Sequence, residues 1–144
     1  MNTQRHVIEN ESKVPTLAGL LIEGFSNIIA LFVAIVVFLI IQTGVIEDLT
    51  ESWQGMQEPL LIRLIVRVYQ TGMFFVLIVT WAIFIINLWL FTSLIRGRYS
   101  NIQASKVYTY QLIYGLIILL INPLLGILYC FSGYKGKIAT TKPG

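Results

Sequence analysis

Three long apolar stretches, separated by short polar ones, dominate the pattern of this sequence. The first covers 17–43 and is unbroken in apolar character from Ile28 to Ile41. A helix that crosses lipid needs about 20 mainly apolar residues. We therefore predict a first transmembrane helix at 17–43, preceded by a flexible polar tail at 1–16. The following QTGVIEDLTES lacks the small-residue cleavage site of a signal peptide, so we expect the helix to remain as an anchor.

The second apolar stretch follows an acidic loop at 44–58 and begins at Pro59, a residue suited to the first helical position. Arg63 and Arg67 lie four residues apart, so they share one face of an otherwise apolar helix. This pattern is typical of a helix in the headgroup region. We predict an interfacial amphipathic segment at 59–71, which bends near Gly72 into a second transmembrane helix at 72–95.

A basic loop at 96–107 precedes the third apolar stretch, 108–134, and a basic tail at 135–144 follows it. Tyrosines near both ends suggest two aromatic belts around one span; they are Tyr108, Tyr110, Tyr114, Tyr129 and Tyr134. Asn122-Pro123 divides this stretch. We favour a single transmembrane helix kinked at the proline, since neighbouring groups can satisfy the freed carbonyl. The alternative is a re-entrant hairpin.

The expected fold is all-α: a polytopic membrane protein with three transmembrane helices plus an interfacial amphipathic helical segment. Basic residues remain on the cytoplasmic side, which places the N-terminus inside. Three spans then leave five basic residues on each side, whereas a re-entrant hairpin leaves eight inside and two outside. The short loops favour a bacterial cytoplasmic membrane.

Composition supports the membrane interpretation. The 144 residues are 56% hydrophobic and 12% charged, whereas soluble domains are about 25% charged. The net charge of +3 does not indicate nucleic-acid binding, because the basic residues lie between apolar stretches and form no patch on a polar surface.

Small and polar side chains recur at helical spacing within the apolar stretches, which favours packing between helices or against a partner. The candidates are Glu23, Asn27, Thr80, Asn87, Asn122 and Gly126. Thr80 and Asn122 lie at similar distances along the chain from the basic loop, so we expect them to meet. Glu23 falls just outside the 20 residues that end at Thr43, which places it at the interface.

The inventory of reactive side chains argues against catalysis and against a cofactor. His6 lies in the predicted tail, Cys130 lies in an apolar stretch, and no nucleophile, phosphate-binding or zinc motif is present. The acidic loop lacks the spacing of a calcium loop, so we expect no metal site; its acids are Glu47, Asp48, Glu51 and Glu58. Anionic lipid headgroups or an acidic partner helix would suit Arg63 and Arg67.

These observations favour a non-catalytic accessory, assembly or immunity-type subunit of a larger membrane complex. Its expected partners are the bilayer and other membrane protein subunits or itself. The layout is similar to that of the small multi-span bacteriocin-immunity proteins. The alternative is a small transporter or channel formed by homo-oligomerisation, in which Glu23, Asn27, Thr80, Asn87 and Asn122 surround a shared centre.

Overall fold

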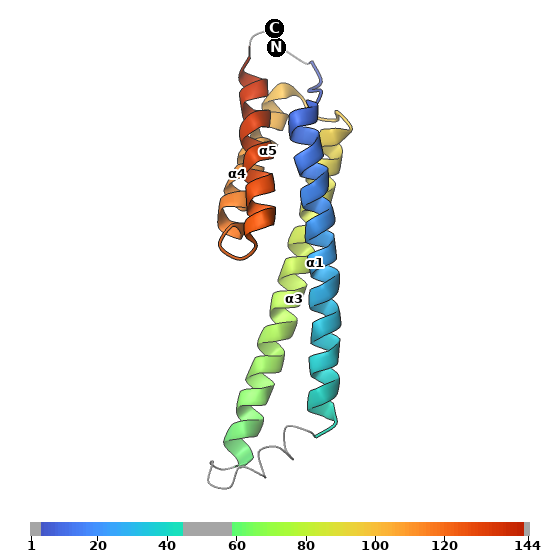
Figure 1. Ribbon diagram of the computed structural model, residues 1–144, viewed down its shortest axis with the longest axis vertical. Coiled ribbons are helices and arrows are strands. Elements are labelled where there is room, and N and C mark those ends of the chain that lie inside the picture. The colour runs from blue at the N-terminus through green and yellow to red at the C-terminus, as the bar shows by residue number, and fades with distance from the viewer. Residues whose placement is uncertain (1–3, 45–58, 143–144) are drawn as a thin grey trace. The chain divides into compact units, whose positions relative to one another are not determined.

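The computed structural model describes residues 4–44 and 59–142, and these residues form four α-helices. The helices are α1 (Asn10–Gln42), α3 (Pro59–Ile95), α4 (Asn101–Ile118) and α5 (Pro123–Thr141) (Figure 1). They contribute to two compact units. Unit 1 comprises residues 1–24 and 83–144, and unit 2 comprises residues 25–82. Helices α1 and α3 each contribute one part to each unit.

Helices α1 and α3 are long and apolar enough to cross a membrane. They contain 33 and 37 residues, or roughly 50 Å and 55 Å at about 1.5 Å per residue. Helix α3 is continuous through Gly72, so the structure does not divide an interfacial segment from a span there. A single glycine costs a helix only about 1 kcal/mol, which neighbouring residues can offset.

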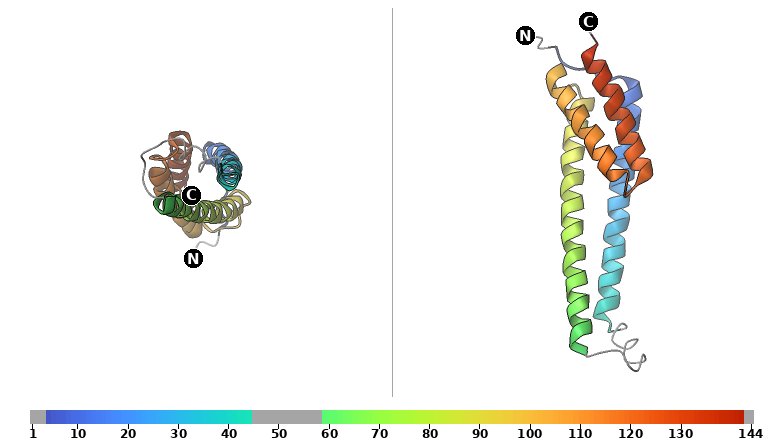
Figure 2. Two further views of the ribbon diagram at one scale, coloured as in Figure 1. Left: turned by 90° about the horizontal axis from the view of Figure 1, so that it is seen from below. Right: turned by 90° about the vertical axis from the view of Figure 1, so that its left-hand side faces the viewer.

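The third apolar stretch differs from the favoured prediction. It does not form one kinked helix, because α4 ends at Ile118 and α5 begins at Pro123, and the two fold into a hairpin (Figure 2). The Asn122 side chain accepts a hydrogen bond from the Leu125 backbone N–H at 3.3 Å. Asparagine as N-cap with proline directly after it starts a new helix. A third transmembrane helix is therefore not shown.

Glycines bring the backbones of α4 and α5 together. A Cβ atom added to Gly133 would lie 2.8 Å from Leu112 N and 2.9 Å from Tyr108 O, both backbone atoms of α4. A Cβ atom on Gly115 would lie 2.8 Å from Cys130 N. These approaches are possible only without a side chain, so the glycines determine how closely the hairpin closes.

The N-terminal residues do not form the predicted tail. Helix α1 begins at Asn10, and before it the His6 N–H donates to the Tyr99 carbonyl at 2.8 Å. The buried His6 ring lies 3.1 Å from Asn101 Oδ1 and 2.8 Å from the Tyr108 hydroxyl. The prediction failed because polar residues without apolar periodicity gave no sign of these long-range contacts.

The basic loop and basic tail are also more helical than expected. Ser100 and Gln103 form a capping box that begins α4 at Asn101, which leaves only a short turn after α3. Helix α5 continues to Thr141. Lys135 lies 3.5 Å from the Glu11 carboxylate, and the Lys137 ammonium donates to Thr109 at 2.9 Å. These contacts hold the end of α5 beside α1 and α4.

The hydrophobic core lies in unit 1, where parts of all four helices meet. Its most deeply buried members come from α3, α4 and α5 and include Phe91, Leu94, Ala104, Tyr108, Leu125 and Tyr129. Unit 2 instead exposes large apolar side chains; Phe32 and Phe75 are 67% and 68% exposed. Such exposure is unfavourable in water and ordinary in lipid.

Candidate functional site

Glu23 is the centre of a buried polar cluster in unit 1. Its side chain is 5% exposed. The Asn87 amide donates to Glu23 Oε1 at 2.9 Å, and so does the Tyr114 hydroxyl at 2.9 Å. The Tyr129 hydroxyl donates to Oε2 at 2.5 Å. The three donors come from α3, α4 and α5, so one carboxylate on α1 links all four helices.

Asn87 extends this cluster to a further tyrosine. Its Oδ1 accepts from the Tyr110 hydroxyl at 2.5 Å. Tyr110 and Tyr114 lie four residues apart on α4, and their rings stack with centroids 6.0 Å apart. The Tyr129 ring of α5 lies 5.7 Å from that of Tyr114. We call these five residues, Glu23, Asn87, Tyr110, Tyr114 and Tyr129, the Glu23 cluster.

The donors of the Glu23 cluster satisfy its carboxylate from within the protein. Both carboxylate oxygens accept at least one hydrogen bond. Hydrogen bonds to a charged group are the stronger kind, and they offset part of the cost of removing the carboxylate from water. Three of its about four acceptor sites are therefore occupied by side chains of the protein itself.

A second buried network lies in unit 1 and joins α1, α4 and α5. The Gln111 amide donates to Thr16 Oγ1 at 2.9 Å. The hydroxyls of Thr16 and Ser132 both donate to the Ser12 carbonyl, each at 2.7 Å. All of these side chains are at most 1% exposed. The network therefore adds polar contacts that hold the hairpin against α1.

The structure brings together two of the residues predicted for helix packing or partner binding, and it gives others local roles. Glu23 and Asn87 are bonded directly. Gly126 belongs to the hairpin contact, since a Cβ there would lie 2.5 Å from the Leu119 Cα. Asn122 caps α5. Glu23 is enclosed by protein, and its position at the membrane interface stays a prediction.

The other two residues predicted for helix packing or partner binding, Asn27 and Thr80, lie in unit 2. The Thr80 hydroxyl donates to the Leu77 carbonyl at 3.0 Å, within its own helix. Asn27 is buried, and its Nδ2 has no hydrogen-bond partner in the described part of the chain. A contact between Thr80 and Asn122 stays a prediction.

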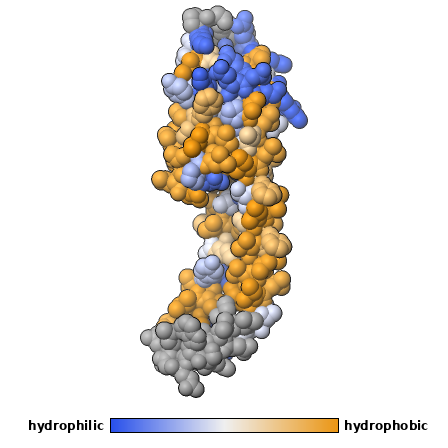
Figure 3. All heavy atoms as spheres, viewed as in Figure 1, coloured by the Kyte–Doolittle hydropathy of each residue, from blue (hydrophilic) through white to orange (hydrophobic). Residues whose placement is uncertain are grey.

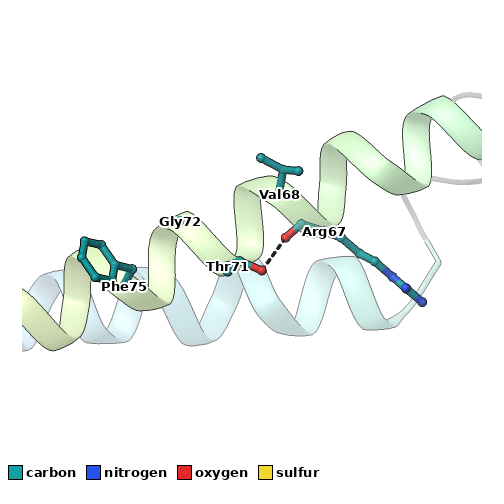
Figure 4. Close-up of a pocket in the computed structure, with 5 residues that line it drawn as sticks. All are labelled: Arg67, Val68, Thr71, Gly72 and Phe75. Carbon is teal, nitrogen blue, oxygen red and sulfur yellow. Dashed lines mark hydrogen bonds between the residues drawn. The ribbon is translucent and has the colours of Figure 1, made fainter.

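Arg63 and Arg67 are exposed on α3 in unit 2. Figure 4 shows the Arg67 side chain extending away from Phe75 and the Thr71 hydroxyl donating to the Arg67 carbonyl, at 2.9 Å. The acids of the predicted loop, Glu47, Asp48, Glu51 and Glu58, lie outside the described residues. Within 4–44 and 59–142, no group of three or more His, Cys, Asp or Glu side chains could hold a metal ion.

The tyrosines of the Glu23 cluster are the functional residues that sequence reasoning missed. The predicted aromatic belts put them at opposite ends of a span, but Tyr114 and Tyr129 are in ring contact. The belt interpretation was wrong because it assumed one continuous helix. The spacing of Tyr110 and Tyr114 on one helix face was the available signal.

Comparisons with known proteins do not assign this chain to a family or a fold. Neither a protein-family model, nor a curated protein, nor a solved structure matches the chain.

Proposed function

We propose that this chain is a non-catalytic, multi-pass membrane protein that serves as an accessory, assembly or immunity-type subunit of a larger membrane complex. Helices α1 and α3 cross the bilayer, and the α4–α5 hairpin enters it from one side and returns. The observation that carries the proposal is the Glu23 cluster. Its buried carboxylate accepts three hydrogen bonds from the other three helices, whereas an enzyme or transporter needs polar groups that a substrate can reach.

The turn of the hairpin suits entry into lipid. Buried backbone N–H groups need partners at membrane depth, and those of residues 119–122 all donate to carbonyls of α4. The side chains at this turn are apolar and exposed; Leu120 and Ile121 are 89% and 78% exposed. The apolar side chains and the bonded N–H groups of residues 119–122 both reduce the cost of placing this turn in the bilayer.

The charge distribution supports this topology. Eight of the ten basic residues belong to unit 1, and only Arg63 and Arg67 belong to unit 2. The start of α1 and the end of α5 lie side by side, as the contact of Glu11 with Lys135 indicates. Hydrophilic side chains gather at this end of the unit (Figure 3). Because basic residues remain in the cytoplasm, we place this end, with the N-terminus, on the cytoplasmic side of a bacterial membrane.

The alternative function, a homo-oligomeric channel or transporter, needs polar faces that can surround a shared centre. Two of its candidate residues, Glu23 and Asn87, bond to each other inside unit 1. Facing a pore would require both to leave their tyrosine partners. This geometry favours the accessory role.

The proposal predicts a stoichiometric complex with a different membrane protein and no transport activity. The tagged full chain, expressed at its native level and extracted in mild detergent, should elute with a partner in constant ratio. Glu23→Leu, which disrupts unit 1, should lose the partner, whereas Glu11→Leu at the exposed surface should retain it. Vesicles that contain the pure chain should pass protons and potassium no faster than empty vesicles. A homo-oligomer that conducts either ion, or a lone monomer, would contradict the proposal.

A further inference from the structure

Unit 2 contains two hollows along the seam between α1 and α3. The apolar hollow has a volume of about 520 Å³ and is lined by small and flexible side chains that include Ala30, Ala34, Gly72 and Met73. The polar hollow, about 310 Å³, is lined by Gln42, Arg63, Arg67 and Gln70 among others. Both volumes fall in the range of small-molecule sites, about 300–1,000 Å³.

The two hollows follow one another along α3. Val66 and Gln70 line the polar hollow, and Tyr69 and Met73 line the apolar hollow. Steps of three and four residues keep these side chains on one face of a helix. The seam therefore passes from an apolar hollow to a cationic one within about two helical turns, an arrangement that matches an amphiphile.

Two side chains of the polar hollow, Gln70 and Arg67, have donors without an acceptor among the described residues. Gln70 Nε2 is buried and has no hydrogen-bond partner in the described part of the chain. The Arg67 guanidinium forms no ion pair with any residue in 4–44 or 59–142, and it lies within a helical turn of Arg63 on the same face. Guanidinium groups hold phosphate through paired N–H donors. The guanidinium groups of Arg63 and Arg67, together with the side-chain amide of Gln70, form a site that is complementary to a phosphodiester.

We propose that this seam binds one anionic phospholipid. Arg63, Arg67 and Gln70 hold its phosphate, and one acyl chain lies against Ala30, Ala34 and Gly72. The inference rests on the proposed membrane embedding and does not depend on the accessory role. The surface at Gly72 has space for the acyl chain, since a Cβ atom added there would meet nothing within 4 Å.

Native mass spectrometry of the detergent-extracted full chain tests the proposal. The chain is mixed with equal amounts of phosphatidylglycerol and phosphatidylcholine, and the retained lipid is counted. Wild type should retain phosphatidylglycerol over phosphatidylcholine by about tenfold, since each basic residue near a headgroup contributes severalfold. Arg63→Gln with Arg67→Gln should reduce this preference to near unity. Gly72→Leu should lower retention of both lipids, because its side chain occupies the apolar hollow.

The matched control carries Arg96→Gln with Arg98→Gln, which removes the same charge from exposed positions in unit 1. It should keep the wild-type preference. Equal retention of both lipids by wild type, or equal loss in the control, would overturn the proposal. Lipid retention requires no protein partner, so failure of the lipid site and failure of the accessory role give different results.

Discussion

Replacing Glu23 by leucine should destabilise unit 1 by at least about 2 kcal/mol. The change leaves Asn87, Tyr114 and Tyr129 without the acceptor that each now uses. Hydrogen bonds to charged groups contribute about 1.5–3 kcal/mol each in soluble proteins. The average between membrane helices is only about 0.6 kcal/mol. Three bonds at the smaller value already reach the lower limit, and the orphaned donors add to it.

The free energy of unfolding, measured by circular dichroism in mixed micelles with increasing sodium dodecyl sulfate, checks this expectation. Glu23→Gln keeps one carbonyl acceptor and should cost less than leucine. Glu11→Leu is the matched control, because Glu11 is exposed and its ion pair with Lys135 contributes at most about 1 kcal/mol. Equal stability of Glu23→Leu and Glu11→Leu would show that the Glu23 cluster does not hold the helices.

Alanine at Gly133 should destabilise the hairpin by about 1–3 kcal/mol, the usual cost of overpacking. The new Cβ would meet the backbone of Leu112 and Tyr108, and backbone atoms cannot move aside as a flexible side chain can. Gly126→Ala should act in the same direction, since its Cβ would meet the Leu119 backbone. The same unfolding titration measures both.

Gly72→Ala is the same chemical change, but we expect it to have the opposite effect on the free energy of unfolding. Nothing lies within 4 Å of its added Cβ, so alanine should be neutral or stabilise α3 by up to about 1 kcal/mol. If Gly133→Ala were as stable as Gly72→Ala, the close contact between α4 and α5 would be wrong.

The two long helices could be predicted from the sequence because a long apolar stretch has few alternatives. Length alone, however, could not separate a kinked span from a hairpin at Asn122-Pro123. The local signals for a helix start, asparagine followed by proline, were present. The apolar character of the whole stretch outweighed them, and the prediction of a third transmembrane helix followed.

The candidate site could be predicted only in part, because some of its contacts depend on the α4–α5 hairpin. Glu23 and Asn87 were identified from helical spacing, which is a local property. Tyr129 reaches Glu23 only because α5 folds back along α4, so its role depends on the hairpin. His6 likewise meets Tyr108 across most of the chain. Contacts of this kind leave no periodic trace in one sequence.

If the α4–α5 hairpin enters the bilayer and returns, both of its ends lie on one side of the membrane, and accessibility labelling can show this. Single cysteines are placed at Arg98, Lys142 and Thr43 in a Cys130→Ala background, because the native thiol donates only a long hydrogen bond, 3.8 Å, to the Leu112 carbonyl. A membrane-impermeant maleimide is added to intact cells and to inverted vesicles. We expect Arg98→Cys and Lys142→Cys to be labelled from the same side and Thr43→Cys from the other. Labelling of Lys142→Cys from the side of Thr43→Cys would contradict it.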